Sequence, residues 1–329
     1  MVLCKKWILA KPFEGQVKKD NFKLEEEEIS DKLNDGEFLC EAVFLTVDPY
    51  MRTRELGAKV GVAMGGEQIA KVIASKNANH PVGSLTRMRS GWRTHTLVKE
   101  ADKEVIRMPD LGDLSPSLVL GIMGMPGMTA YFGFLEICKP KAGEVVLVNG
   151  AAGAVGSLVG QIAKIKGCTV IGFAGDDAKC KWIKEDLGFD HVYNYKKIDI
   201  DVALKEAAPD GVDCYFDNVG GEFTSKAIMH MKLFGRMSIC GSISAYNSTA
   251  PPMGPLPYMI ILGKQLKVEG FIVMRWFQKW AEGEKEMKTW IKEGKIKYRE
   301  TVTEGFDNMP KAFMGLFSGS NVGKAIIKV

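Results

Sequence analysis

Residues 144–156 read EVVLVNGAAGAVG, so a run of Val and Leu leads directly into a turn made of Gly and Ala. The short apolar run is typical of a strand that is buried on both faces of a parallel sheet. After the turn, apolar residues recur at helical spacing as far as Gly167: Val155, Leu158, Val159, Ile162 and Ile165. The stretch therefore predicts a buried strand, a tight turn and a helix in direct succession.

The turn at residues 150–156 has the composition of a loop that binds phosphate. Small residues let the backbone approach a pyrophosphate, and the N-terminus of the following helix offers free N–H groups and a partial positive charge. Gly156 would let the helix pack closely on the strand. No Lys-Ser or Lys-Thr pair follows the last glycine, which excludes a P-loop. We favour dinucleotide binding, and a purely structural turn is the alternative.

The alternation of strand and helix continues to about residue 273. Strands are predicted at 144–149, 169–174, 190–195, 212–219, 236–241 and 267–273. Asp176 is placed to cap the helix that follows the second strand and ends at Gly188. Repeated βα units imply an α/β fold with a doubly wound parallel sheet covered on both faces.

The chain has a different character on either side of this region. Short β-like runs at 38–45, 68–73 and 94–98, separated by Gly and Pro, indicate a small twisted barrel or sandwich. The acidic run Glu25 to Glu28 is interpreted as a solvated face. After a helix at 277–293, a strand at 297–303, a helix at 309–317 and a strand at 324–329 are predicted. Those last strands are candidates to return to the first portion, and 329 residues favour two domains.

Composition narrows the class of protein. Hydrophobic residues make up 46%, charged residues 26%, and the net charge is only +4, so a soluble globular protein is expected and nucleic acid is not. Residues 114–135 are free of charge and long enough to span a bilayer, but their Gly and Pro residues favour a buried turn and a core helix. The seven cysteines form no Cys-x-x-Cys pair and no signal peptide is recognisable, so we expect free thiols and a cytoplasmic location.

With metal chemistry and an activated serine nucleophile not supported by the sequence, hydride transfer from a bound nicotinamide is the remaining candidate reaction. The four histidines are neither paired at ligand spacing nor next to a cysteine, so no metal site is predicted, and the pattern Gly-x-Ser-x-Gly is absent. A bound nicotinamide would supply the reactive atom. At the end of the second strand the acids Asp176 and Asp177 come late and resemble caps, while Lys179 is within reach of a 2′-phosphate, which favours NADP. The alternative is that Lys179 is an ordinary solvated lysine.

Three tyrosines are candidates to face a substrate oxygen: Tyr50, Tyr246 and Tyr258. The last two lie in a charge-free stretch, residues 237–263, whose four prolines indicate a binding loop. Each of the three can also be an ordinary core or surface tyrosine.

Four phrases of the sequence, at 45–52, 124–131, 151–156 and 213–221, together make the whole chain resemble the medium-chain dehydrogenases and reductases. Gly66-Glu67 stands where zinc-dependent members carry Gly-His-Glu, and the four-cysteine lobe is missing, so the chain is similar to the zinc-free branch. The resemblance implies a GroES-like β-barrel substrate domain at 1–120 and 297–329, and a Rossmann NADP-binding domain at 121–296. It also implies NADPH as the cofactor, with contacts from Ala152, Gly153, Ala154, Val155, Lys179, Tyr195, Asn218, Cys240, Gly241, Ser242, Ile243, Ser244, Ala245, Tyr246, Phe271, Ile272, Val273 and Asn321.

The reaction that the resemblance implies is reduction of the carbon-carbon double bond of α,β-unsaturated ketones and aldehydes. The substrates would be 15-oxo-prostaglandins, reduced at the 13,14 bond, and 2-alkenals, and NADP-dependent oxidation of a leukotriene hydroxyl is a further implied activity. Hydride would reach the β-carbon, and a tyrosine with the cofactor ribose hydroxyl would stabilise the enolate oxygen. Family members carry that tyrosine where this chain has Leu262-Gly263, so Tyr258 is taken as the catalytic candidate.

Tyr50, Arg52 and Tyr246 are the candidates for the substrate side. A lipid substrate would need a cation for its carboxylate, and Arg52 or Arg54 is available for it. The resemblance also suggests a homodimer. Two alternatives stay open: a quinone oxidoreductase of the same fold, and a non-catalytic NADPH-binding protein related to crystallins.

Overall fold

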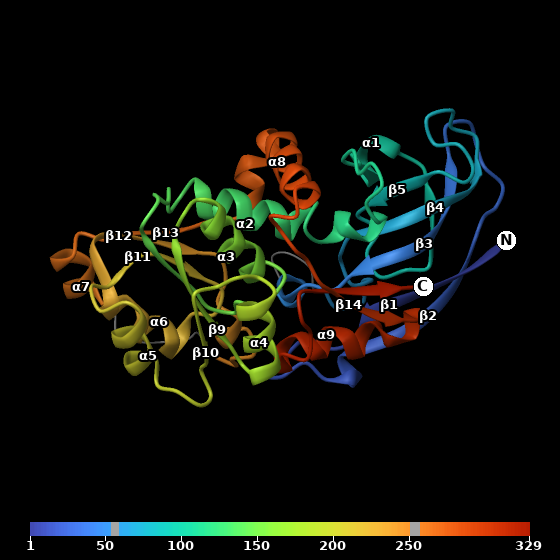
Figure 1. The fold of residues 1–329 in the computed structure, drawn as a ribbon. Helices are drawn as coiled ribbons and strands as arrows, with labels where there is room; N and C mark the ends of the chain where they lie inside the picture. Colours follow the sequence, from blue (N-terminus) through green and yellow to red (C-terminus); the bar gives the residue numbers. More distant parts are fainter. Residues whose placement is uncertain (54–58, 251–256) are drawn as a thin grey trace. The chain divides into compact units, whose positions relative to one another are not determined.

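The computed structural model describes residues 1–53, 59–250 and 257–329 (Figure 1). The chain divides into two compact units. Unit 1 comprises Met1–Leu120, Glu300–Asn321 and Ala325–Val329, and unit 2 comprises Gly121–Arg299 and Val322–Lys324. Both ends of the chain therefore belong to unit 1, and unit 2 is inserted between them.

Unit 1 is built from antiparallel strands. β1 (Val2–Leu9) pairs with β2 (Phe22–Ile29), and a second sheet in the described residues has the order β14-β15-β3-β4-β5-β7, with β6 also paired to β3. The strands of this sheet are β3 (Phe38–Thr46), β4 (Gln68–Ser75), β5 (Leu85–Met88), β6 (His95–Val98), β7 (Val105–Ile106), β14 (Glu300–Glu304) and β15 (Lys324–Lys328). The strands predicted at 38–45, 68–73 and 94–98 are confirmed as β3, β4 and β6, and β15 lies antiparallel to β3.

Aromatic side chains form the main core of unit 1. The rings of Phe22 and Trp92 stack with centroids 5.6 Å apart, and Phe313 meets both edge-on at 6.1 and 5.6 Å. Phe313 belongs to α9 (Met309–Ser318), which buries Met309 in the same cluster. The other α-helix of unit 1 in the described residues, α1 (Ala101–Glu104), is a single short turn. Residues from both ends of the sequence thus share one core, whose burial of large apolar side chains stabilises unit 1.

Unit 2 contains, in its described part, a six-stranded parallel sheet in the order β10-β9-β8-β11-β12-β13. Its strands are β8 (Val145–Val148), β9 (Thr169–Ala174), β10 (His191–Asn194), β11 (Val212–Asp217), β12 (Met231–Ile239) and β13 (Lys267–Gly270). β12 begins five residues before the predicted start at 236, because Met231 already pairs with Val212 of β11; the register then shifts before Arg236 pairs with Cys214. The order of the strands reverses between β8 and β11, which makes this the switch point of the sheet.

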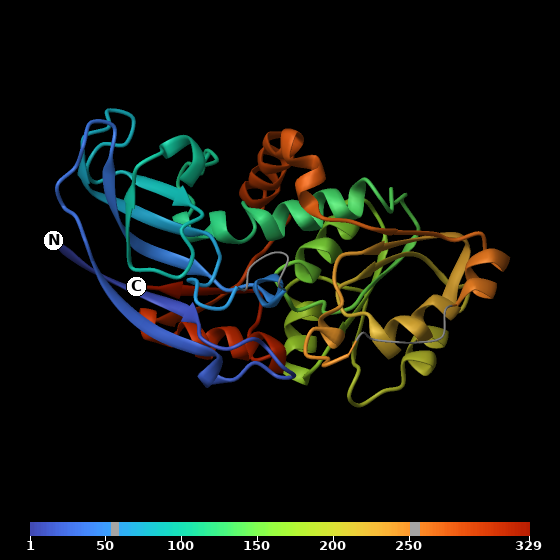
Figure 2. The ribbon, with the colours of Figure 1, turned by 180° about the vertical axis from the view of Figure 1, so that it is seen from behind.

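Helices cover both faces of the sheet of unit 2 (Figure 2). The helices are α2 (Met125–Leu135), α3 (Gly156–Ile165), α4 (Asp177–Glu185), α5 (Ile200–Ala207), α6 (Gly221–Ala227), α7 (Tyr258–Gly263) and α8 (Trp280–Lys292). Leu147 and Ile171 pack in one core with Ala203 of α5. Gly172, the next residue along β9, points the other way and meets Phe189, which packs on Gly160 of α3. The predicted doubly wound α/β arrangement is therefore confirmed.

The charge-free stretch at 114–135 forms a 3₁₀ helix at Pro116–Leu120 and then α2, as the sequence predicted. No described helix has the length and hydropathy that crossing a membrane requires. All seven cysteines are free thiols, and five of them are buried.

Candidate functional site

The turn between β8 and α3 has the geometry of a phosphate cradle. Gly150 adopts a left-handed φ of +56°, and its carbonyl oxygen accepts a hydrogen bond from the N–H of Gly153 at 3.0 Å. A Cβ on Gly156 would lie 2.4 Å from the same carbonyl oxygen, so only glycine allows α3 to start this close to the turn. Val155 and Gly156 stand at the start of the helix, where N–H groups have no intrahelical acceptor, and the described residues supply no backbone acceptor to either. These observations fit the pyrophosphate of a dinucleotide.

The segment Val322–Lys324 is attached to this turn. The N–H of Gly323 donates to the carbonyl oxygen of Ala152 at 2.8 Å, and the N–H of Lys324 donates to Arg299 at 2.9 Å. Gly323 has a φ of +65°, and a Cβ there would lie 2.0 Å from the carbonyl oxygen of Arg299. Asn321, a predicted cofactor contact, lies two residues before Gly323 in the sequence.

At the end of β9, both acidic side chains are engaged by neighbours. The carboxylate of Asp176 caps α4 by accepting from the backbone N–H of Lys179 at 2.8 Å, as predicted. Asp177 pairs with Lys197 and accepts from Asn194, and these partners lower the pKa of its carboxyl, Lys197 having the larger effect. Both acids therefore already have a backbone N–H or a lysine as partner.

Lys179 and Tyr195 lie close to this strand end. The ammonium of Lys179 is 3.8 Å from Asp176, and its side chain is only 12% exposed, so it is held near the sheet. The ring of Tyr195 packs against Gly175, and Tyr195 is half exposed. A fixed cation beside an aromatic ring fits an adenosine that carries a 2′-phosphate.

The turns after β11 and β12 lie against each other on the other side of the switch point. The N–H groups of Cys240 and Gly241 donate to the carbonyl oxygen of Asp217 at 2.9 and 3.1 Å. The N–H of Ile243 donates to Asn218 at 3.3 Å, and that of Ser244 donates to Val219 at 3.1 Å. The structure therefore brings the predicted contacts Asn218 and Cys240–Ser244 together in one pair of turns.

Two polar side chains in these turns have altered acidity. Burial raises the pKa of the Tyr246 hydroxyl, which accepts from the N–H of Ser242 at 3.5 Å. Burial, and secondly the charge of Asp217, raise the pKa of the Cys240 thiol to about 12. Tyr246 is thus a neutral hydroxyl and Cys240 an uncharged thiol at neutral pH.

The three predicted contacts after β13 differ from one another. A Cβ on Gly133 of α2 would lie 2.2 Å from the ring of Phe271, which also packs 5.4 Å from the ring of Trp276, so the Phe271 side chain packs on α2 and is partly buried. Val273 is buried, while Ile272 is 60% exposed. At Val273, whose side chain is buried, the backbone is the part available to a ligand.

The substrate candidates Tyr50 and Arg52 lie in a 3₁₀ helix of unit 1, Pro49–Arg52. Burial, followed by the charges of Asp48 and Glu67, raises the pKa of Tyr50, so its hydroxyl is a donor throughout the physiological range. The guanidinium of Arg52 donates to the carbonyl oxygen of Gly15 at 2.7 Å. Arg54, the other candidate cation, lies outside the described residues.

Tyr258, the catalytic candidate, is the first residue of α7 and is 66% exposed. The prolines at 251, 252 and 255, which contributed to the prediction of a binding loop, lie outside the described residues. The catalytic role of Tyr258 stays a prediction.

Asn149 and Asp217 were missed as site residues in the sequence. Both are 1% exposed. Asn149 directly follows β8, and Asp217 is the last residue of β11, so both lie at the cradle. Asn149 donates to Asp217 at 2.7 Å and accepts from the N–H of Asn218 at 2.7 Å. Polar residues at the carboxyl ends of two neighbouring buried strands were the available signal.

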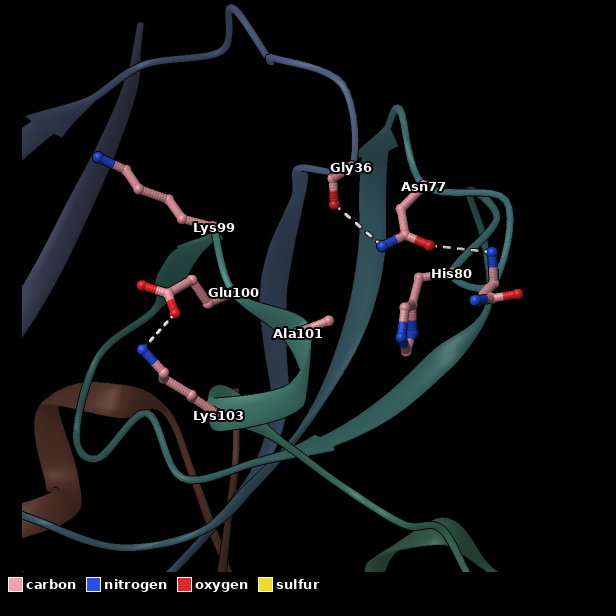
Figure 3. Close-up of a pocket in the computed structure, with 8 residues that line it drawn as sticks. Gly36, Asn77, His80, Lys99, Glu100, Ala101 and Lys103 are labelled. Carbon is pink, nitrogen blue, oxygen red and sulfur yellow. Dashed lines mark hydrogen bonds and ion pairs between the residues drawn. The ribbon is translucent and has the colours of Figure 1, made fainter.

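Unit 1 also has an open pocket of about 450 Å³ between the loops around Asn77 and Glu100 (Figure 3). Its polar groups engage one another: Lys103 pairs with Glu100 at 2.5 Å, and Asn77 donates to the carbonyl oxygen of Gly36 at 2.9 Å. His80 stacks on Phe38 with centroids 4.4 Å apart. The polar groups of this pocket are therefore less available to a ligand than those of the cradle of unit 2.

Within residues 1–53, 59–250 and 257–329, no group of three or more His, Cys, Asp or Glu side chains is arranged to hold a metal ion.

Comparison with known proteins gives a consistent result. A family model described as the N-terminal domain of oxidoreductase matches residues 5–106, and one described as zinc-binding dehydrogenase matches residues 154–289. The chain is 52% identical to prostaglandin reductase 1 of Bos taurus, with 100% of both chains covered. It is 37% identical to the NADP(+)-dependent 2-alkenal reductase of Nicotiana tabacum over 99% of this chain and 97% of that one. The crystal structure of CurA from Vibrio vulnificus in complex with NADPH matches with a TM-score of 0.91 and 36% identity, covering 99% of each chain.

Proposed function

The chain belongs to the medium-chain dehydrogenase/reductase family, and we propose that it is an NADPH-dependent reductase of the carbon-carbon double bond of α,β-unsaturated ketones and aldehydes. The observation that carries this proposal is the cradle at the switch point of unit 2. At Gly156, where α3 starts, the turn leaves no room for a side chain, and Lys179 is held at the end of β9 where a 2′-phosphate would lie.

The residues present fit NADPH. The turn at Gly150–Gly156 would hold the pyrophosphate, Lys179 and Tyr195 the adenosine end, and the turns at Asn218 and Cys240–Tyr246 the nicotinamide end. When bound, the cofactor supplies hydride. The neighbouring acids Asp176 and Asp177 already interact with Lys179 and Lys197, which makes them weaker acceptors for the ribose hydroxyls of NAD.

The protein must also place a hydrogen-bond donor at the substrate carbonyl oxygen, because reduction at the β-carbon concentrates negative charge there. A preorganised donor of this kind contributes about 3–4 kcal/mol to the barrier reduction. Tyr246 and Tyr50 keep their protons because burial raises the pKa of each hydroxyl. Tyr258 is the third candidate, and we propose it as the catalytic donor of the proton or of the hydrogen bond.

We propose lipid enones such as 15-oxo-prostaglandins, together with 2-alkenals, as substrates. The likeness to prostaglandin reductase 1 and to the tobacco 2-alkenal reductase supports both classes. Arg52 is the proposed partner of a lipid carboxylate. Its guanidinium now contacts the carbonyl oxygen of Gly15 and the ring of Phe13, so it is ordered at the protein surface of unit 1.

The test is the loss of the reduced-nicotinamide absorbance with purified protein, NADPH and a 15-oxo-prostaglandin. Parallel wells contain NADH, a small 2-alkenal and a quinone. We expect NADPH to be consumed with the prostanoid and the alkenal, and product mass to show a saturated double bond. Consumption with the quinone alone would favour the quinone oxidoreductase, and saturable NADPH binding without consumption would favour the non-catalytic binder.

We also propose the domain functions, the assembly and the location. Residues 1–120 and 297–329 would form the GroES-like substrate domain and 121–296 the Rossmann domain, which the division into units 1 and 2 supports. A homodimer is supported by β13, an edge strand of the described sheet, and by the exposed Ile272, Met274 and Phe277 that follow it. Light scattering would give its mass. The free thiols support a cytoplasmic location, which cell fractionation tests.

A further inference from the structure

The side chain of Asp217 is enclosed by hydrogen-bond donors at the end of β11. It is 1% exposed, and all four of its donors are uncharged groups. Oδ1 accepts from three N–H donors and Oδ2 from one hydroxyl: Asn149 Nδ2 at 2.7 Å, Val219 N at 3.0 Å, Gly220 N at 2.9 Å and Thr224 Oγ1 at 2.7 Å. A buried carboxylate is stable only when its oxygens are satisfied in this way.

These donors connect the three turns that surround the cradle. Asn149 precedes the turn after β8, and Val219 and Gly220 form the turn after β11. The turn after β12 is joined through the backbone, because Cys240 and Gly241 donate to the carbonyl oxygen of Asp217. One residue therefore bonds to the segments that follow β8, β11 and β12, on both sides of the switch point.

The same network orients Asn218, a predicted cofactor contact. Asn149 accepts from the N–H of Asn218 at 2.7 Å through its side chain, and its backbone carbonyl accepts from the Asn218 amide at 2.8 Å. The turns are also in close contact, since a Cβ on Gly220 would lie 2.3 Å from the hydroxyl oxygen of Ser242. A change at Asp217 would therefore be passed to all three turns.

We propose that Asp217 is a positioning residue for NADPH: its buried carboxylate holds the turns after β8 and β11, and its backbone carbonyl holds the turn after β12, at the separation that the dinucleotide requires. This inference rests on the proposed function. Hydrogen bonds to an ionised carboxylate are short and strong, and in a buried site they fix geometry. Removing the carboxylate leaves four donors without their acceptor and lets the turns after β8 and β11 move apart.

Asp213 provides a matched control at the other end of the same strand. Its carboxylate accepts from the N–H of Val145 at 2.9 Å and from Lys232 at 3.0 Å, and its side chain is 16% exposed. Asp213 thus ties β8 to β11 as Asp217 does, but at the amino ends of the strands. Its loss should affect stability without reaching the cradle.

The experiment measures the Kd of NADPH by nicotinamide fluorescence, without an enone, for the full chain and the variants Asp217→Ala, Asp217→Asn and Asp213→Ala. Circular dichroism gives the folded fraction at the assay temperature. We expect the Kd to rise about tenfold or more in Asp217→Ala and about threefold in Asp217→Asn, whose amide keeps the acceptor oxygen but not the charge. Asp213→Ala should unfold at a lower temperature and keep its Kd within about twofold.

Turnover supplies the readout that a purely structural role would not change. In Asp217→Asn, the KM for NADPH should rise while kcat at saturating NADPH stays near that of the unaltered protein. A folded Asp217→Ala with an unchanged Kd, or an equal rise in Asp213→Ala, would overturn the inference. If Asp217→Ala does not fold, Asp217→Asn decides, and an unchanged Kd there refutes it. Absence of NADPH binding by the unaltered protein would refute the proposed function instead.

Discussion

Replacing Gly156 with alanine should weaken NADPH binding while leaving most of unit 2 folded. An added Cβ would lie 2.4 Å from the carbonyl oxygen of Gly150 and 3.0 Å from the Cα of Ala151. Both are backbone atoms, so no side chain can rotate away. The start of α3 or the turn must move by about 0.6 Å to bring the first contact to 3.0 Å, the shortest that packed side chains tolerate.

That displacement is large relative to a hydrogen bond. N–H···O distances typically span about 2.7–3.2 Å, so N–H groups displaced this far no longer reach the same phosphate oxygens. Losing one hydrogen bond to a charged oxygen costs about 1.5–3 kcal/mol, which raises the Kd of NADPH roughly 10- to 100-fold. Overpacking adds about 1–3 kcal/mol of destabilisation.

Fluorescence titration of NADPH measures the Kd, and urea unfolding measures the stability. Gly160→Ala is the matched control, because it adds the same atom to the same helix but meets the ring of Phe189 at 1.8 Å. It should destabilise the fold and leave the Kd within about twofold. A folded Gly156→Ala protein that binds NADPH as tightly as the unaltered chain would show that the turn does not hold the pyrophosphate.

Three further perturbations test other parts of the molecule. Glu67→Gln should lower the free energy of unfolding by about 3 kcal/mol in urea titrations, because the Arg87 guanidinium, which is 1% exposed and 2.6 Å from that carboxylate, loses this charge partner. Replacing both residues by Met should restore part of the lost stability. An unchanged free energy of unfolding in Glu67→Gln would contradict the reasoning. Lys179→Ala should raise the Kd of NADPH about tenfold and leave that of NADH unchanged, and an equal effect on both would remove the 2′-phosphate assignment. Burial raises the pKa of the Cys40 thiol from 9.0 to about 12, so the unfolded chain releases this proton at lower pH than the folded chain does. The free energy of unfolding should therefore fall as the pH rises from 9 toward 12. In alkaline urea titrations, Cys40→Ala should show a smaller dependence of stability on pH.

Local patterns in the sequence were sufficient for much of unit 2. β9 begins and ends where its apolar run does, and α3 begins one residue after Val155, the first apolar residue of the helical pattern, and ends at Ile165, the last. Asp176 was predicted as a cap because capping depends on residues three apart, and the structure confirms it. The cradle was predicted for the same reason, since Gly150, Gly153 and Gly156 lie close together in the sequence.

Contacts between distant residues were not predictable in this way. The bond from Asn149 to Asp217 joins residues 68 apart in the sequence, so no local pattern marks it. β2 was missed because the run Glu25 to Glu28 has low strand propensity and reads as solvated. It is stabilised by its partner, since β1 brings Lys6 to 2.6 Å from Glu27, and such cross-strand pairs are invisible until the register is known.

The position of β15 beside β3 constrains how the protein is made. During translation the first 120 residues leave the ribosome long before Phe313 and Ile327, which complete the core around Trp92. Unit 2 is almost continuous in the sequence and has nearly all its strands available earlier, whereas the nascent unit 1 leaves Phe44–Thr46 of β3 without their partner strand until β15 is made. A circular permutant that starts at Glu300 would present unit 1 as one unbroken segment and should shorten that period of exposure.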